Sequence, residues 1–170
     1  MPIKYIEGDL LSSKEDVIIH GCNNQGKFGS GFAKVVRKKH PKAAKDYDRQ
    51  FNDGGLILGS VIWSFDERLI GHAIVQPTYG KIGTGRHLSY TALESAFTAV
   101  RDCAINGIPV PNFSRGFKSI SMPLIGSSLG GGDWAEIEKI IQKTLGDFDV
   151  CVYALPGNKP SAKDLNTKFK

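Results

Sequence analysis

The sequence predicts an α/β sandwich around a mixed, mostly parallel sheet, and three observations lead to this class. Six short apolar runs have the length and composition of strands. Between most of them lie longer segments whose apolar residues recur at three- and four-residue spacing, as in amphipathic helices packed on a parallel sheet. One pair of runs is instead joined by a short turn at 66–68, which predicts a hairpin and therefore an antiparallel part of the sheet.

The expected elements follow one another along the chain. We expect strands at 3–7, 17–20, 60–65, 69–76, 119–124 and 150–155. We expect helices at 30–39, 43–52, 90–106 and 134–145. The first helix ends before Pro41, because the residue that precedes a proline avoids the helical conformation. Residues 107–118 contain two prolines and two glycines and are expected to form a long loop. This loop is either a surface insertion without a role in the site or a lid over the substrate.

Length and composition indicate a single domain. A chain of 170 residues can bury a sufficient core without disulfides or a structural metal. We expect residues 1–155 to form the domain and the charged segment 156–170 to be a flexible C-terminal extension outside the core. The three cysteines, Cys22, Cys103 and Cys151, lack the spacing of metal ligands and are expected to be reduced thiols. No apolar run is long enough to span a bilayer, so we expect a cytoplasmic protein with no membrane partner.

The first candidate binding element is a glycine-rich loop between a strand and a helix. The apolar run that ends at His20 is followed by Gly26, Gly29 and Gly31 and then by a basic helix. Glycines let a ligand approach the backbone, and free N–H groups at the start of a helix attract anions. The segment is therefore either a plain tight turn or a cradle for phosphate.

A second loop of the same kind follows about a hundred residues later. The apolar run 120–125 ends in a glycine-rich stretch at 126–132, which is followed by the last long helix. Two such units in one short chain predict two cradles that face a single anionic ligand.

The chain carries a formal charge of +5, and the excess is local. The basic residues gather in the helical segment after the first loop and in the tail: Lys34, Arg37, Lys38, Lys39, Lys42, Lys45, Lys159, Lys163, Lys168 and Lys170. Two explanations stay open, a solvated helix face with a frayed terminus or a surface for nucleic acid.

With these loops in place, the chain resembles the macrodomain family of ADP-ribose-binding proteins over residues 3–155. Four motifs carry the resemblance, in the family's order: Gly8-Asp9-Leu10, His20-Gly21-Cys22-Asn23 with Gly29-Ser30-Gly31-Phe32-Ala33, His40-Pro41-Lys42-Ala43-Ala44-Lys45-Asp46-Tyr47, and Met122-Pro123-Leu124-Ile125-Gly126 with Leu129-Gly130-Gly131-Gly132-Asp133-Trp134. The middle two are similar to the branch of ADP-ribose 1''-phosphate phosphatases. The resemblance implies a three-layer α/β/α sandwich whose central sheet has about six strands.

The resemblance also implies where ADP-ribose would lie. Asp9 would accept a hydrogen bond from the adenine amine, helped by the backbone N–H of Leu10, and the diphosphate would lie between the two loops. Either Tyr153 or Leu155 would stack on adenine, since they share one face of the last strand. The implied ligand-binding residues are Asp9, Leu10, Gly21, Asn23, Gly29, Ser30, Gly31, Phe32, Ile125, Gly126, Ser127, Ser128, Leu129, Gly130 and Leu155.

Four residues are candidates for catalysis, and each has a structural alternative. His20 would transfer protons, or it is a buried histidine satisfied by its neighbours. Asn23 would orient the distal ribose, or it braces the loop. Lys81 aligns with the catalytic lysine of glycohydrolase branches, or it is an exposed loop lysine. Asp133 is the nearest carboxylate to the second loop, or it caps a helix.

One departure from the family pattern bears on the choice of reaction. Gly130 stands where the protein glycohydrolase branch carries an aspartate, which argues against a mechanism that pairs lysine with aspartate. We therefore expect a hydrolase, without cofactor or metal, that removes the 1''-phosphate from ADP-ribose 1''-phosphate. The alternatives are a Lys81-dependent hydrolase that releases ADP-ribose from protein or nucleic acid, and a reader that only binds. The expected partners are ADP-ribose derivatives or an ADP-ribosylated macromolecule, and the expected state is a monomer.

Overall fold

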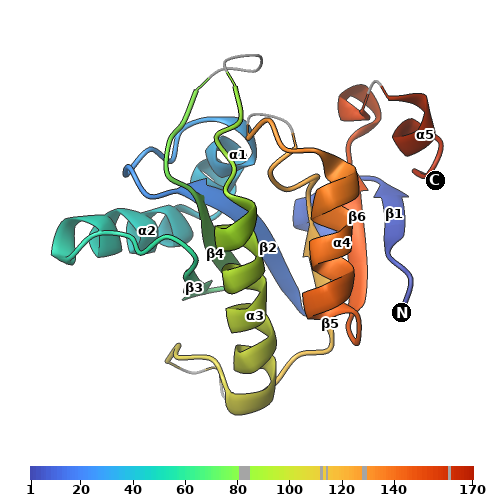
Figure 1. Cartoon of the computed structure of the whole chain (residues 1–170). Helices are drawn as coiled ribbons and strands as arrows, with labels where there is room; N and C mark the ends of the chain where they lie inside the picture. Colours follow the sequence, from blue (N-terminus) through green and yellow to red (C-terminus); the bar gives the residue numbers. More distant parts are fainter. Residues whose placement is uncertain (81–84, 112, 114, 128–129, 161) are drawn as a thin grey trace.

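The computed structural model describes residues 1–80, 85–111, 113, 115–127, 130–160 and 162–170 (Figure 1). Its strands are β1 (Lys4–Glu7), β2 (Val17–Asn23), β3 (Val61–Phe65), β4 (Leu69–Gln76), β5 (Ser119–Met122) and β6 (Asp149–Ala154). Its helices are α1 (Gly31–Lys39), α2 (Pro41–Asp53), α3 (Tyr90–Asn106), α4 (Trp134–Leu145) and the short α5 (Lys163–Asn166). Two 3-10 turns cover Leu10–Ser12 and Pro156–Asn158.

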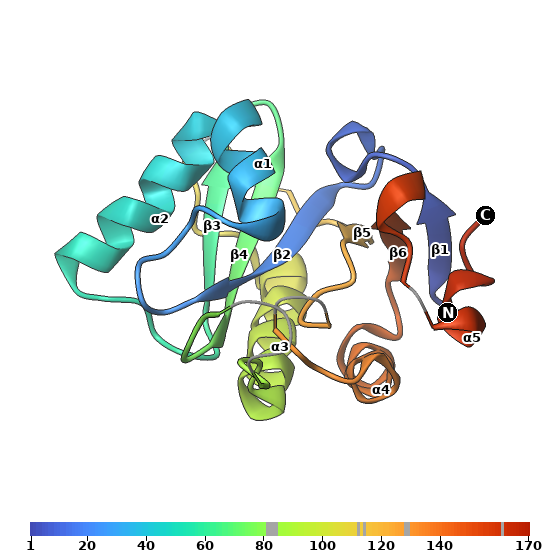
Figure 2. The ribbon, with the colours of Figure 1, turned by 90° about the horizontal axis from the view of Figure 1, so that it is seen from above.

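The strands form one six-stranded sheet in the order β1-β6-β5-β2-β4-β3. All neighbours are parallel except β3 and β4, which form the hairpin expected from the turn at 66–68. Helices α1 and α2 cover one face of the sheet, and α3 and α4 cover the other (Figure 2). The predicted three-layer α/β/α sandwich is confirmed.

Strand β2 shows how sequence alternation builds both cores. Val17 and Ile19 belong to the apolar cluster under α3 and α4, whereas Ile18 and Cys22 belong to the cluster under α1 and α2. Because β2 pairs with β5 on one side and β4 on the other, its side chains are buried on both faces. The carboxyl ends of these three parallel strands meet at one edge of the sheet, which is where ligands bind in such folds.

Several element boundaries differ from the expected ones, and those of β2 and α2 have a clear physical reason. Strand β2 continues beyond His20 to Asn23, because it keeps pairing with β4 through an irregularity between Cys22 and Asn23. Helix α2 begins at Pro41, since a proline is tolerated at the first helical position, where its missing N–H is not needed. No helix in the described ranges, of which α3 with 17 residues is the longest, is long and apolar enough to cross a membrane.

The last residues of the chain, 162–170, lie along the outer edge of β1. Phe169 is buried in the larger apolar cluster, and its ring centroid lies 5.3 Å from that of Tyr5. The backbone N–H of Glu7 donates to the carbonyl of Lys170 over 2.9 Å. The expectation that this segment lies outside the core therefore does not hold for Phe169. The physical reason is that an edge strand has unpaired backbone groups, which the returning chain satisfies.

Candidate functional site

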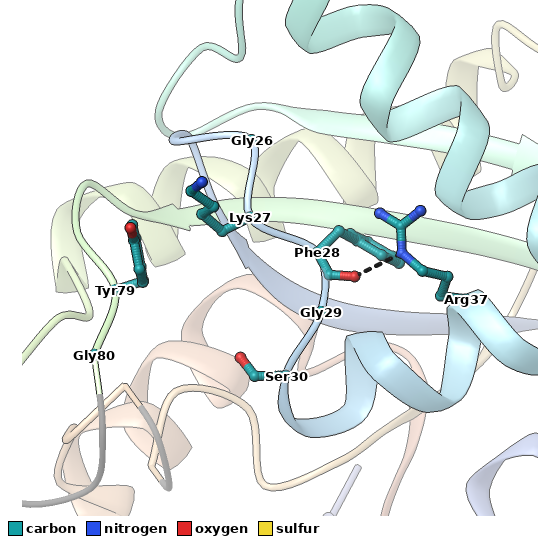
Figure 3. Close-up of a pocket in the computed structure, with 8 residues that line it drawn as sticks. All are labelled: Gly26, Lys27, Phe28, Gly29, Ser30, Arg37, Tyr79 and Gly80. Carbon is teal, nitrogen blue, oxygen red and sulfur yellow. Dashed lines mark hydrogen bonds between the residues drawn. The ribbon is translucent and has the colours of Figure 1, made fainter.

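A cavity of about 560 Å³ lies beside the first glycine loop (Figure 3). The loop 26–30 forms one wall, and Tyr79 and Gly80, which follow β4, form the opposite wall. Arg37 from α1 also lines the cavity. The cavity therefore lies at the carboxyl ends of β2 and β4, as the topology predicts.

Asn23 holds the first loop in shape. Its side-chain carbonyl accepts hydrogen bonds from the backbone N–H groups of Gln25 (3.0 Å) and Lys27 (3.2 Å), and its amide donates to the carbonyl of Lys27 (2.8 Å). The buried hydroxyl of Tyr47 donates to the backbone carbonyl of Asn23 over 2.7 Å and lies 3.1 Å from its side-chain oxygen. This is the loop-bracing geometry that the sequence left open as an alternative.

Phe28 and Arg37 anchor the middle of the loop. Phe28 is buried among the residues under α1 and α2. The Nε of Arg37 donates to the Phe28 carbonyl over 2.9 Å, and its guanidinium pairs with Asp48 at 3.1 and 3.2 Å. Since the charge of Arg37 is shared with Asp48, Lys27 is the more available cation of the cavity wall.

The start of α1 keeps backbone donors available for an anion. Ser30 is the N-cap of α1, and its side chain caps none of the first N–H groups. Gly29, Ser30 and Gly31 are exposed, and Phe32 is half-buried. Gly31 has φ +57°, a conformation that favours glycine. The predicted phosphate cradle therefore has its donors at the surface.

The start of the second loop packs against β2 at Gly21. A Cβ on Gly21 would lie 3.0 Å from Cγ1 of Ile125 and 3.2 Å from Cγ2 of Val75, so any larger residue would push these buried side chains away by a few tenths of an ångström. Gly126 has φ +76°, and its carbonyl accepts from the Gly132 N–H over 2.8 Å. The hydroxyl of Ser127 donates to the Leu124 carbonyl over 2.9 Å. Ser128 and Leu129 lie outside the described residues.

Gly130 explains the departure from the family pattern. A Cβ at this position would lie 2.6 Å from the carbonyl oxygen of Gly126, a backbone atom that has no freedom to move away. The Gly130 carbonyl also accepts from the N–H groups of His87 (2.8 Å) and Leu88 (2.9 Å). An aspartate does not fit this loop conformation.

The structure places His20 in the interior, not at the rim of the cavity. The side chain is 1% exposed and makes edge-on contacts with the rings of Phe28 and Phe32, each at 5.5 Å between centroids. Burial, and then the neighbouring His72, holds the pKa of His20 well below its usual value. A neutral, enclosed imidazole cannot reach a substrate, so direct proton transfer by His20 is not supported by this geometry.

His20, Cys22 and His72 are the one His, Cys, Asp and Glu cluster of metal-binding size in the described chain. Nε2 of His20 lies 2.7 Å from Nδ1 of His72, shorter than the roughly 3.3 Å that separates two nitrogens around a tetrahedral zinc ion. Burial raises the pKa of the Cys22 thiol, which disfavours the thiolate that a metal requires. The arrangement is that of a hydrogen bond between rings.

The adenine end predicted from the sequence lies at the ends of β1 and β6. The carboxylate of Asp9 accepts from the Leu11 N–H and the Ser12 hydroxyl, both at 3.1 Å, and Leu10 beside it is buried. The Gly8 N–H donates to the Ala154 carbonyl, which brings Asp9 and Leu155 close together. Leu155 is 46% exposed, whereas the hydroxyl of Tyr153 is bonded to Glu15, so Leu155 is the better placed to stack on a base.

The remaining two catalytic candidates are Asp133 and Lys81. Asp133 is the N-cap of α4 and accepts from the Ala135 N–H over 3.0 Å, which is the capping alternative. Lys81 lies outside the described residues. Sequence reasoning missed the roles of Tyr47, Arg37 and Tyr79. Only Tyr47 had a signal, its place at the end of the third motif.

Comparisons with known proteins agree with this architecture. No family model matches the chain. The ADP-ribose 1''-phosphate phosphatase of Saccharomyces cerevisiae is 27% identical over 188 aligned positions, which cover 90% of this chain and 98% of that protein. The DNA ADP-ribosyl glycohydrolase of Thermus aquaticus is 24% identical over 170 positions, 96% of this chain but 44% of that protein.

A solved structure shows the same fold. The macrodomain protein from Streptomyces coelicolor superimposes with a TM-score of 0.69 and 27% identity, over 90% of this chain and 99% of that one. The strand order, the helices on both faces and the two glycine loops are thus found together with sequence similarity to macrodomain hydrolases along nearly the whole chain. The chain therefore has the fold of macrodomains and is similar to them in sequence.

Proposed function

We propose that this protein hydrolyses ADP-ribose 1''-phosphate to ADP-ribose and inorganic phosphate. The observation that carries the proposal is the packing of Ile125, which precedes the second glycine loop, against Gly21 of β2, the strand that leads into the first loop. The similarity to ADP-ribose 1''-phosphate phosphatases supports the choice of reaction, since it covers 90% of the chain. The ligand would run from Asp9 and Leu155 at the adenine end to the 26–30 loop at the phosphate end.

The loops would act by binding charge. Backbone N–H groups at the start of α1 would hold the 1''-phosphate and stabilise the negative charge that develops as water attacks phosphorus. Asn23 would keep these donors in place through its bonds to Gln25 and Lys27. His20 would act as a positioning residue under Phe28 and Phe32, because its ring touches the loop and not the cavity.

The test is calorimetric titration with ADP-ribose and phosphate release from ADP-ribose 1''-phosphate, on the wild type and two glycine variants. A Cβ on Gly29 meets nothing within 4 Å, so Gly29→Glu adds a negative charge to the cradle without a clash. Gly54, at the end of α2, is equally open, and Gly54→Glu is the matched control. We expect Gly29→Glu to weaken binding and turnover at least tenfold and Gly54→Glu to change neither. No phosphate release by the wild type would overturn the proposed reaction.

A second candidate is release of ADP-ribose from a macromolecule, favoured by the similarity to a DNA ADP-ribosyl glycohydrolase over 96% of the chain. Lys81 would then act at the anomeric carbon. Release of ADP-ribose from a modified strand or protein that is lost in Lys81→Ala would favour this reaction. Binding of ADP-ribose without turnover of either substrate would instead indicate a reader.

A further inference from the structure

Hydrolysis of ADP-ribose 1''-phosphate calls for a proton donor, because breaking the bond between phosphorus and the anomeric oxygen leaves a negative charge on that oxygen. His20 is enclosed in the interior, and Asp133 caps α4. All four histidines lie in the described part of the chain. His20, His40 and His72 are buried, whereas His87 is half-buried, so His87 is the one imidazole that solvent reaches.

His87 is fixed to the second glycine loop through its backbone. Its N–H donates to the carbonyl of Gly130 over 2.8 Å. The neighbouring residues pack just as closely, since a Cβ on Gly131 would lie 2.6 Å from the carbonyl oxygen of Gly85 and 3.1 Å from the Cα of Arg86. The position of the His87 backbone is therefore set by the second loop.

The side chain of His87 reaches the segment that forms one wall of the cavity. Its Nδ1 lies 2.8 Å from the hydroxyl of Thr78, which comes directly before Tyr79 in that wall (Figure 3). The same segment is bonded to the first glycine loop, because the side-chain amide of Gln25 donates to the carbonyl of Pro77 over 3.0 Å. A continuous run of contacts thus leads from the first loop through Thr78 and His87 to the second loop.

We infer that His87 protonates the leaving oxygen of ADP-ribose 1''-phosphate and that Thr78 positions its ring, an inference that rests on the proposed function. Both nitrogens of a protonated imidazole carry hydrogen, so Nδ1 donates to the Thr78 hydroxyl and the proton is transferred from Nε2, the nitrogen that does not face Thr78.

The step balances with water as the nucleophile. As the oxygen of water bonds to phosphorus, the bond between phosphorus and the anomeric oxygen breaks, and its electron pair stays on that oxygen. The proton from Nε2 of His87 joins this oxygen and gives ADP-ribose. The attacking water loses one proton to solvent, which leaves inorganic phosphate, and solvent returns a proton to the ring.

The test compares phosphate release from ADP-ribose 1''-phosphate with calorimetric titration of ADP-ribose. In His87→Asn, the amide can keep the bond to Thr78 at the place of Nδ1 but has no proton to transfer at the place of Nε2. We expect kcat to fall about 100-fold or more and Kd for ADP-ribose to change less than about twofold. Imidazole added to His87→Ala should raise kcat about tenfold or more. The matched control is Asn23→Ala, which disturbs the first loop and should gain nothing from imidazole.

Thr78 needs its own pair of variants. Thr78→Val keeps the shape of the side chain but removes the acceptor, so kcat should fall about tenfold with KM unchanged, and Thr78→Ser should keep the wild-type rate.

The outcomes separate this inference from the proposed function. An unchanged kcat in His87→Asn, while the wild type releases phosphate, would overturn only the role of His87. A loss of ADP-ribose affinity as large as the loss of kcat, without rescue by imidazole, would make His87 a structural residue and would also overturn it. No release by the wild type would overturn the proposed function and the inference with it.

Discussion

Nε2 of His20 and Nδ1 of His72 lie 2.7 Å apart inside the protein, on directly paired positions of β2 and β4. Nε2 of His72 continues to the hydroxyl of Ser64 on β3, 3.0 Å away. The three buried groups form a hydrogen-bonded chain across three strands, beneath the first glycine loop. Either direction of donation along the chain keeps both rings neutral.

The two buried histidines make the free energy of unfolding depend on pH. Burial lowers the pKa of His72 to about 3, and burial together with His72 lowers that of His20. Below pH 6.5, the ordinary pKa of histidine, the two imidazoles bind protons in the unfolded state but stay neutral in the folded state. The free energy of unfolding therefore falls as the pH falls from about 6.5 toward 3. Each histidine contributes a loss of about 1.4 kcal/mol per pH unit in that window.

Urea denaturation between pH 4.5 and 7 measures this effect. The slope of unfolding free energy against pH should be smaller in His72→Asn, which has one buried imidazole fewer. Carboxylates also titrate below pH 5, so the comparison is made between variant and wild type. An identical slope in both would show that His72 does not remain neutral in the folded protein.

The second prediction concerns His20 itself. His20→Ala leaves a hole between Phe28 and Phe32 and an unpaired His72, so it should lower stability by about 2 to 4 kcal/mol. If His20 only positions the loop, its titration should not appear in the pH dependence of the wild-type rate between pH 6 and 8. A limb in that range that disappears in His20→Ala, measured where the variant is folded, would restore a catalytic role.

Asn23 provides the third prediction. Asn23→Ala removes the acceptor of two loop N–H groups and should weaken ADP-ribose binding, with a loss of about 1 to 3 kcal/mol in stability. Asn24→Ala is the matched control. Asn24 is the next residue in the chain and is half-buried, but the N–H groups of Gln25 and Lys27 are bonded to Asn23 and not to it. Titration with ADP-ribose and thermal unfolding are the measurements. Equal effects in both variants would argue against the bracing role.

Gly21 provides the fourth. Gly21→Ala forces Ile125 and Val75 away from β2 and should cost about 1 to 3 kcal/mol, with weaker phosphate binding as the second loop shifts. Gly157→Ala, where a Cβ meets nothing within 4 Å, should leave stability and binding unchanged. Thermal unfolding and titration with ADP-ribose compare the two. Full ligand affinity in a destabilised Gly21→Ala would show that the loops do not depend on this contact.

Asp133 provides the fifth. Because its carboxylate caps α4, Asp133→Ala should lower stability by about 1 kcal/mol and leave kcat for phosphate release unchanged. Asp133→Ser, which keeps a capping oxygen, should recover most of the stability. A large fall in kcat in both variants would make Asp133 part of the catalytic machinery.

Much of the fold could be predicted because it rests on local pattern. The alternation along β2 specifies a strand buried on both faces, and the three- and four-residue spacing on α3 and α4 specifies helices that cover one of them. The start of α2 was harder to place, because Pro41 both follows the end of α1 and begins α2. The contact of Phe169 with Tyr5 joins the two ends of the chain, and no local pattern encodes it.

By itself, the sequence determined the α/β class, the two glycine loops at strand ends and the likeness to macrodomains, since each depends on residues that are neighbours in the chain. Only the tertiary structure decided what His20 and Gly130 do. His20 meets His72 after 52 residues, and Gly130 meets the carbonyl of Gly126 only in the folded loop. Whether a histidine transfers protons or is a buried structural residue depends on its hydrogen-bond partners and on its exposure to water, and both are set by packing.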